Sequence, residues 1–236
     1  MDNDNSISII VPALNEEDQL SNTVKTLKDS LHCWDEYEII IVNDGSTDKT
    51  YQIAQSLSAG DNRIIPVHNK KSKGKGHCTK QGFQRATGNY LICVNGKNDT
   101  TSDQLKKIYA EKGKADIVIS CQANTFDRPL IRQILSKLYT KIINILFSKD
   151  LKYYNGSILL KKSLYQTIQI EADSYAFEAE MLLKLLFKNH SYTQIDVIDV
   201  FESSRNSRAF TLKNISGVTF TVLKLFFQLR ISGSTF

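Results

Sequence analysis

The strongest constraint on this chain is a regular alternation of short β-rich runs and amphipathic helical segments. Ile7 to Val11 is a β-rich run that Pro12 ends, and apolar residues at helical spacing follow between Leu20 and Leu31. Glu38 to Val42 repeats the pattern, with turn residues and then a helical segment from Thr47 to Leu57. Strands that alternate with helices imply right-handed crossovers, so the sequence predicts a mostly parallel sheet.

The alternation continues through the first half of the chain and becomes less regular in the second. The predicted fold class is α/β, a mostly parallel central sheet flanked by helices. Ligands of such sheets bind at the carboxyl edge, which here gathers the loops of Asn15, Asp44 and Asn95. Further strands are expected over Arg63 to Val67, Tyr90 to Val94, Ile117 to Ser120 and Ile158 to Leu160. Further helices are expected over Gly76 to Ala86, Ser102 to Glu111, Leu130 to Phe147, Ala176 to Phe187 and Val218 to Ile231.

Length and composition favour a single domain over residues 1–236. A chain of 236 residues with 41% hydrophobic content can bury a substantial core. The four cysteines form no C-x-x-C pair, so we expect them to be reduced and to bind no zinc. Ile7 to Val11 is too short for a signal sequence or a membrane span, and the residues before it are polar. We therefore expect a cytoplasmic protein.

Basic residues are concentrated in two stretches that contain no acid. Residues 62–98 hold eight Lys or Arg and no Asp or Glu, and residues 203–236 are also free of acids. The first stretch suggests an anionic ligand, and the second an anionic surface or a phosphate. No aromatic residues are interleaved with the basic run as a base-stacking surface requires, so we expect no nucleic-acid partner.

The C-terminal segment, residues 205–236, is basic and amphipathic. Between residues 218 and 231 a narrow polar stripe of Thr221, Lys224 and Gln228 interrupts an otherwise apolar helix, which is too short to span a bilayer. Two interpretations stay open. The helix lies in the inner face of a membrane as a peripheral contact, or it packs on the domain's own core or on another subunit, as in a homodimer.

Two motifs each follow a predicted strand directly. Residues 11–17 read Val-Pro-Ala-Leu-Asn-Glu-Glu, and residues 42–48 read Val-Asn-Asp-Gly-Ser-Thr-Asp. A third element, residues 74–88, contains Gly-Lys-Gly, Gln-Gly-Phe and Ala-Thr-Gly. Over residues 7 to about 120, these motifs resemble the family 2 glycosyltransferases of the GT-A fold. More narrowly, they resemble the branch of dolichol-phosphate mannosyltransferases and polyprenyl-phosphate glycosyltransferases.

The resemblance implies transfer of a sugar, with inversion, from a nucleotide-diphosphate sugar to a polyprenyl- or dolichyl-phosphate or a glycan acceptor at a membrane surface. Residues 7–120 would then form the nucleotide-binding half, and residues 121–204 the half for sugar and acceptor. The family's matching Asp contacts the nucleotide, so Asp44 is the strongest donor-binding candidate. The resemblance places the other donor contacts at Pro12, Ala13, Asn15, Glu16, Gly45, Lys75, Gly76, Asn95 and Gly96.

These residue types also suit the chemistry on physical grounds. The Asp44 carboxylate can accept hydrogen bonds from a ribose or a base N–H, and Gly45 permits a sharp turn beside it. The alternative is that Asp44 only caps the helix that begins near Thr47. Lys75 and Gly76 open a predicted helix, where free N–H groups and a lysine can hold phosphate.

The segment from Asn95 to Asp99 departs from the family pattern. Most members carry an Asp-x-Asp motif here that binds a divalent metal, whereas this chain has Asn95 and Lys97 at the two acid positions. An ammonium cannot coordinate a cation, so three hypotheses stay open. Lys97 replaces the metal by neutralising the diphosphate. Asp99, with the Asn98 amide, binds Mg²⁺ or Mn²⁺ in a shifted register. Or catalysis is lost, which leaves a nucleotide-sugar-binding protein.

The same resemblance supplies candidates in the second half. Glu180 is chosen as the catalytic, sugar-contacting acid, with Glu178 on a neighbouring helix face, and an ordinary first-turn helix carboxylate is the alternative. Ser207 and Arg208, with Arg205 nearby, are placed near an acceptor phosphate, although the glycine and arginine that usually precede this pair are missing. A sugar-nucleotide pyrophosphorylase is the rival enzyme class, but the first loop lacks its glycine-rich signature.

Overall fold

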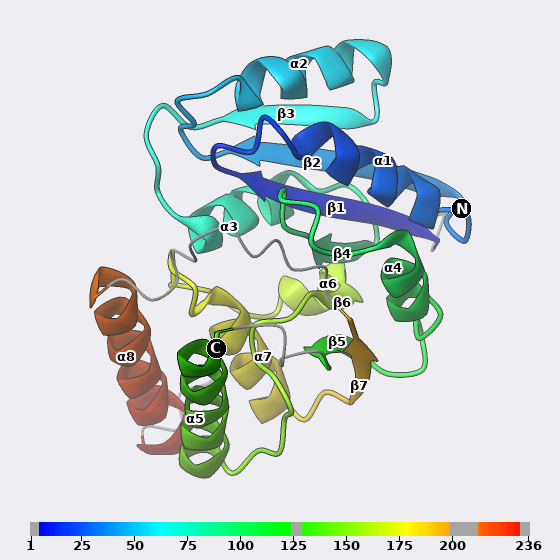
Figure 1. Ribbon diagram of the computed structural model, residues 1–236. Helices are drawn as coiled ribbons and strands as arrows, with labels where there is room; N and C mark the ends of the chain where they lie inside the picture. The colour runs from blue at the N-terminus through cyan, green and yellow to red at the C-terminus, as the bar shows by residue number, and fades with distance from the viewer. Residues whose placement is uncertain (1–4, 124–128, 199–211, 232–236) are drawn as a thin grey trace.

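The computed structural model describes residues 5–123, 129–198 and 212–231 (Figure 1). Within these residues a seven-stranded sheet has the order β3-β2-β1-β4-β6-β5-β7. The strands are β1 (Ser6–Ala13), β2 (Glu36–Asn43), β3 (Ile64–His68), β4 (Tyr90–Cys93), β5 (Ile117–Gln122), β6 (Ile158–Lys161) and β7 (Tyr192–Val197). The helices are α1 (Leu20–Ser30), α2 (Thr50–Gly60), α3 (Lys75–Arg85), α4 (Ser102–Tyr109), α5 (Leu130–Phe147), α6 (Lys162–Tyr165), α7 (Phe177–Phe187), α8 (Leu212–Phe226) and the π-helix η3 (Phe227–Ile231).

The continuous apolar runs of the strands give the sheet two buried faces. Successive side chains of a strand point to opposite faces. Ile9 and Ile39 therefore join the cluster under α1, α2 and α4, whereas Ile10 and Ile40 join the cluster under α3, α5 and α7. All four are fully buried. A sheet covered on both faces requires such unbroken apolar strands, which is why they are visible in the sequence.

Parallel pairing of the first strands positions the site. β1 pairs in parallel with β2 and with β4, and β2 pairs in parallel with β3. The loops that follow β1, β2 and β4 therefore open at one edge, as the sequence predicts. β6 runs antiparallel to its neighbours β4 and β5, and so joins the two halves of the chain in one sheet. The predicted α/β class is confirmed.

The second half contains the differences from the sequence prediction. β7 was not expected, because its polar residues Gln194 and Asp196 interrupt the apolar run of an edge strand that is mostly half-exposed. The last helix begins at Leu212, before the predicted Val218, and its final turn is the π-helix η3. Among the described helices, none is both long and apolar enough to cross a membrane.

Candidate active site

Backbone hydrogen bonds join the three loops at the carboxyl edge of the sheet. The Asp44 N–H donates to the Ala13 carbonyl at 2.8 Å, and the Gly96 N–H donates to the Pro12 carbonyl at 3.2 Å. A Cβ on Gly96 would lie 3.1 Å from the Pro12 oxygen, so glycine permits this close approach. Four of the predicted donor-site residues are thus in direct contact.

Side chains lock the loop after β1 to the loop after β2. Asn15 has a φ of 56°, a left-handed conformation that Asn tolerates. Its N–H donates to Ser46 Oγ at 2.9 Å, and its side-chain oxygen accepts from the Thr47 N–H at 2.9 Å. The Glu16 N–H donates to Thr50 Oγ1 at 2.8 Å. The Asn15 amide oxygen therefore acts within the protein, where it fixes the shape of the edge.

Asp44 holds the basic loop that precedes α3. Its Oδ1 accepts from the Lys73 N–H at 2.8 Å, and its Oδ2 accepts from Ser72 Oγ at 2.7 Å and the Gly74 N–H at 3.0 Å. Gly45 has a φ of 72°, and a Cβ there would lie 2.7 Å from the backbone of the same loop. The capping role considered for Asp44 is not observed, because α2 has no side-chain cap at its N-cap residue. Asp44 instead positions the lysine-rich loop over the sheet edge.

The first turn of α3 is covered by the segment before α7. Gly76 packs so closely there that a Cβ would lie 2.6 Å from the Ser174 carbonyl oxygen. The His77 N–H donates to the Asp173 carbonyl at 3.3 Å, and Lys80 Nζ lies 2.6 Å from the Asp173 carboxylate. The His77 amide is therefore already paired within the protein.

Lys75 forms a largely buried ion pair with Glu178 of α7, with Nζ and Oε1 2.7 Å apart. Burial opposes the charged form of Lys75, but the charge and hydrogen bond of Glu178, together with Cys93 and Asp99, outweigh it and raise the pKa of Lys75. Lys75 is therefore a fixed positive charge at neutral pH. The ion pair connects the donor-side loop to α7, so Glu178 is the acid of that helix that belongs to this cluster.

Two further side chains lie beside this pair, and the sequence did not single them out. Tyr139 of α5 has a buried hydroxyl with no hydrogen-bond partner among the described residues, and burial followed by the Glu178 charge raises its pKa. Cys93 lies 3.4 Å from Thr79 Oγ1, and burial raises its pKa to about 11. Both are therefore neutral near pH 7. Tyr139 occupies an ordinary position of a long amphipathic helix, so no motif could have indicated it.

The loop from Asn95 to Asp99 closes on itself. Lys97 Nζ lies 2.8 Å from Asp99 Oδ2, and Asn95 Nδ2 donates to the same oxygen at 3.3 Å. Asp99 Oδ1 is buried and has no hydrogen-bond partner among the described residues. The Asn98 side-chain oxygen accepts from Thr26 Oγ1 at 3.0 Å. Asn98 is therefore committed to α1 and does not assist Asp99.

This arrangement does not fit a divalent cation at Asp99. The Lys97 ammonium lies on Oδ2 and leaves Oδ1 as the one free carboxylate oxygen, whereas Mg²⁺ prefers an octahedral set of oxygen ligands. Within the described parts of the chain, no group of three or more His, Cys, Asp or Glu side chains is placed to hold a metal ion. The bare Oδ1 of Asp99 can accept a hydrogen bond from a hydroxyl of a bound ligand instead.

Glu180, the acid chosen from the sequence, has its carboxylate enclosed. It forms an ion pair of 2.8 Å with Lys184, and both side chains are at most 2% exposed. Its oxygens also accept from the Glu171 N–H at 3.1 Å and the Ala172 N–H at 2.8 Å. This geometry gives Glu180 a positioning role, because it holds the segment that covers α3.

The predicted acceptor residues cannot be placed in this site. Arg205, Ser207 and Arg208 lie outside the residues that the structure describes. Their assignment to an acceptor phosphate therefore stays a prediction.

Known proteins resemble this chain over most of its length. A family model described as glycosyl transferase family 2 matches residues 8–176. The chain is 25% identical over 186 residues to the dolichol-phosphate mannosyltransferase of Pyrococcus furiosus, covering 75% of this chain and 52% of that protein. It is 23% identical over 236 residues to the glycosyltransferase AglD of Haloferax volcanii, covering 95% of this chain and 38% of that protein. It is 26% identical over 203 residues to the undecaprenyl-phosphate 4-deoxy-4-formamido-L-arabinose transferase of Photorhabdus laumondii, covering 84% of this chain and 60% of that protein. The chain thus spans less than two thirds of the length of each of these relatives.

A similar solved structure is the glucosyl-3-phosphoglycerate synthase from Mycobacterium tuberculosis in complex with Mn²⁺, UDP and phosphoglyceric acid. It superposes with a TM-score of 0.69 at 18% identity, over 94% of this chain and 78% of that one. At this identity the likeness shows the fold, which is GT-A, as the sequence predicts. With this fold and a family model that matches from β1 to the start of α7, the chain belongs to glycosyltransferase family 2.

Proposed function

We propose that this chain is the catalytic unit of a glycosyltransferase that moves a sugar from a nucleotide-diphosphate sugar to a polyprenyl or dolichyl phosphate. The observation that carries the proposal is the gathering of Asp44, Lys75 and Asp99 at the carboxyl edge of the sheet. Similar proteins are named for transfer involving dolichol phosphate and undecaprenyl phosphate, which supports a lipid-phosphate acceptor. A structural neighbour holds UDP, which supports a nucleotide-linked donor.

The donor nucleotide lies over the joined loops after β1 and β2. Pro12, Ala13 and Glu16 border the base and ribose, while Asn15 keeps the two loops in register. Asp44 holds the basic loop in place so that its backbone and lysines face the diphosphate. The donor site is therefore a preorganised edge with positive charge on one side.

Charge stabilisation of the leaving group is assigned to lysine side chains. The bond between the sugar C1 and the diphosphate oxygen breaks, and its electron pair stays on the diphosphate. Lys97 neutralises that charge, and its side chain is 40% exposed and therefore reachable by a ligand. Lys75, fixed by Glu178, adds a second positive charge. No step requires a divalent cation.

The acceptor needs no general base in this scheme. A phosphate monoester has its second pKa near 6, so its oxygen is already ionised at neutral pH. That oxygen attacks C1 from the side opposite the departing diphosphate, which inverts the configuration. Asp99 Oδ1 and the Tyr139 hydroxyl, two of the buried polar atoms that have no hydrogen-bond partner among the described residues, hold hydroxyls of the transferred sugar.

The acceptor places the protein at the cytoplasmic face of a membrane, as a peripheral protein. The last helix packs partly on the core, because Val222 and Leu225 are buried, and its exposed Phe220 and Leu223 are compatible with a membrane contact. A homodimer stays a prediction.

The proposal is tested with purified protein, a panel of UDP- and GDP-sugars, and polyprenyl phosphate in vesicles. The expected product is a lipid-linked sugar phosphate of inverted configuration. Nucleotide binding without product for any donor, and with no gain from Lys97→Asp in manganese, would contradict transfer and favour the nucleotide-sugar-binding alternative.

A further inference from the structure

The outer face of α5 is apolar along its whole length. The exposed positions recur at spacings of three and four residues, so they form one continuous arc of the helix. Monomeric proteins rarely expose a contiguous apolar patch of this extent unless it contacts a partner or a membrane. The exposed residues of this arc are Leu130, Ile131, Ile134, Leu135, Leu138, Ile142 and Ile145.

The neighbouring helix adds a second apolar stripe. α8 lies beside α5 (Figure 1), and the rings of Phe147 and Phe226 are 6.2 Å apart. Apart from Tyr192 and Ile198, every exposed large apolar residue in the described ranges belongs to α5, α8 or η3. The unburied apolar surface is therefore concentrated on one helix pair. Its members on α8 and η3 are Phe220, Leu223, Phe227 and Ile231.

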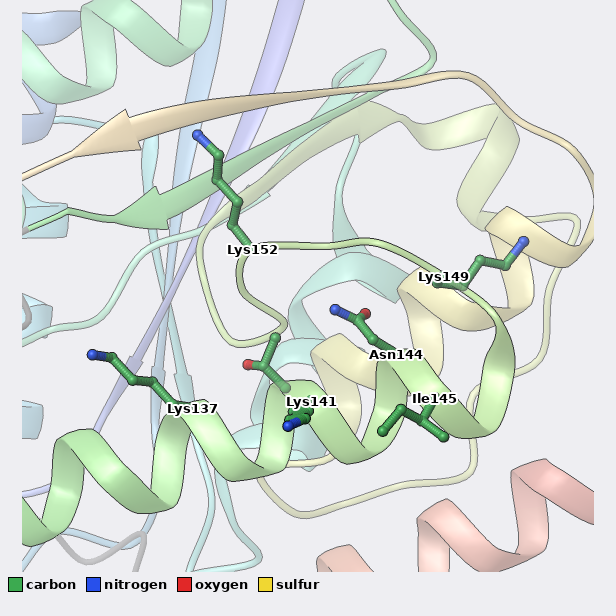
Figure 2. Close-up of a pocket in the computed structure, with 7 residues that line it drawn as sticks. Lys137, Lys141, Asn144, Ile145, Lys149 and Lys152 are labelled. Carbon is green, nitrogen blue, oxygen red and sulfur yellow. The ribbon is translucent and has the colours of Figure 1, made fainter.

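A lysine-lined cavity of about 390 Å³ borders the apolar arc (Figure 2). None of its lining residues is acidic. Ile145 belongs both to the arc and to the cavity wall, so the cavity opens at the edge of the apolar surface. The complete lining is Lys137, Thr140, Lys141, Asn144, Ile145, Lys149 and Lys152.

The four lysines of the cavity differ in whether they have ion-pair or hydrogen-bond partners within the protein. Lys152 is paired with Asp196 at 3.0 Å, and Lys149 donates to the Leu186 carbonyl at 3.1 Å. Burial, and to a lesser extent the nearby Arg230, lowers the pKa of Lys149. Lys137 and Lys141 are exposed, and neither has an ion-pair or hydrogen-bond partner among the described residues. Two cations at the edge of the apolar arc are thus available to a ligand.

We propose that the α5 face docks on a lipid bilayer and that the Lys137–Lys141 cavity binds the phosphate of an anionic phospholipid headgroup. An amphipathic helix in the interface buries its apolar arc among acyl chains and leaves its lysines at the level of the headgroups. A second copy of the chain is disfavoured as the occupant, because a self-complementary contact of two such faces would combine two sets of unpaired lysines with no acidic side chain from the cavity lining to pair with them. Charge complementarity therefore selects an anionic surface. This docking requires neither the donor nor catalysis.

The test is co-sedimentation of the full chain with vesicles of phosphatidylcholine alone, or of phosphatidylcholine and phosphatidylglycerol in equal parts. The wild type is expected to bind the anionic vesicles preferentially, and salt should weaken this binding. The double variant Lys137→Glu/Lys141→Glu should lose at least about tenfold in partitioning to them. The matched control is Lys25→Glu/Lys107→Glu, two exposed helix lysines on α1 and α4, which makes the same change in net charge and should bind as the wild type does.

A second pair of substitutions tests the apolar arc separately. Ile134→Ser/Ile142→Ser should weaken binding to both kinds of vesicle and keep the preference for the anionic one. Circular dichroism of each variant shows that the chain is still folded. Wild-type binding by the lysine double variant would overturn the proposal, and so would an equal loss in the control. A wild-type dimer that the isoleucine pair dissociates, with no vesicle binding, would identify the face as a subunit interface instead.

Discussion

Asp44 and Asp99 are buried acids in loops at the same edge of the sheet, but the protein satisfies only the first. Asp44 is 4% exposed and has three donors on its two oxygens, whereas Asp99 is 8% exposed and has one oxygen with no partner. A buried acceptor left unpaired costs folding free energy. Hydrogen bonds within the protein therefore explain why the Asp44 carboxylate can be buried. A bound ligand would explain why Asp99 Oδ1 is buried without a partner.

The two acids of α7 show the same contrast. Glu180 is enclosed by Lys184 and two backbone amides, while Glu178 pairs with Lys75 and lies near the bare hydroxyl of Tyr139. Two of the described buried side-chain atoms that lack a hydrogen-bond partner, Asp99 Oδ1 and the Tyr139 hydroxyl, lie near Lys75 and Glu178. Substitutions can therefore test separately the acids that hold the fold, Asp44 and Glu180, and the acids of the proposed reacting site, Glu178 and Asp99.

The largest expected effect is on the scaffold. Glu180→Ala leaves Lys184 buried without its partner, which should lower the free energy of unfolding by about 3–5 kcal/mol. Urea denaturation followed by circular dichroism measures the change. The double variant Glu180→Leu/Lys184→Met removes both charges and should recover much of the loss. A loss below about 1 kcal/mol in Glu180→Ala would show that the pair does not support the fold.

The next effect is on catalysis alone. Lys97→Gln should lower the transfer rate by about 10²–10³-fold, because it removes a charge that stabilises the leaving diphosphate. Stability should change by no more than about 1 kcal/mol, since the Lys97 side chain is 40% exposed and Asn95 still donates to Asp99. Lys97→Arg should retain more activity because it keeps the charge, and Lys25→Gln is the matched control. Full activity in Lys97→Gln would exclude this role.

Asp44→Asn and Asp99→Asn compare the two acids directly. Asp44→Asn should cost about 1.5–3 kcal/mol of stability, because hydrogen bonds to a charged acceptor are lost or weakened. It should also weaken nucleotide binding, since the basic loop is released. Asp99→Asn should change stability by no more than about 1 kcal/mol and reduce turnover. Thermal unfolding measures the stability of both variants, and nucleotide titration measures their binding. The control is Asp103→Asn, a substitution at an exposed acid. Equal losses of stability in Asp44→Asn and Asp99→Asn would contradict the difference between the two acids.

The smallest effect concerns a satisfied acid far from the site. Hydrogen bonds from Arg63 and Lys28 hold the pKa of Asp61 well below its ordinary value. Its stabilisation is therefore complete above about pH 4 and is lost as the pH falls toward the folded-state pKa. Acid titrations of stability should show that Asp61→Asn loses less on acidification than the wild type does. Identical acid profiles would contradict this assignment.

The sequence predicted the first half of the fold well for a physical reason. Strands covered on both faces must be continuously apolar, and motifs directly after them mark the carboxyl edge. β7 was not predicted, because a half-exposed edge strand tolerates polar residues such as Gln194 and Asp196, which interrupt the apolar pattern. α5 was predicted to the residue, yet its exposed outer face depends on which side packs, and periodicity alone does not decide that.

That the candidate site residues lie close together could be predicted from the sequence, but their contacts could not. Asp44, Lys75 and Asp99 do lie together, but the partner of Asp44 is a loop nearly thirty residues away, about which spacing carries no information. Glu178 and Glu180 are two residues apart on a buried helix, and only tertiary contacts separate their roles. Tyr139 carries no sequence signal at all.

We propose that Lys97, held by Asp99, replaces a divalent cation in a family 2 donor site. The most direct measurement is a calorimetric titration of UDP and GDP into the protein, first in EDTA and then in manganese. The account predicts that the preferred nucleotide binds with the same affinity in both, and that Lys97→Gln weakens binding in both. Binding that requires manganese, and that Lys97→Gln leaves intact, would contradict it.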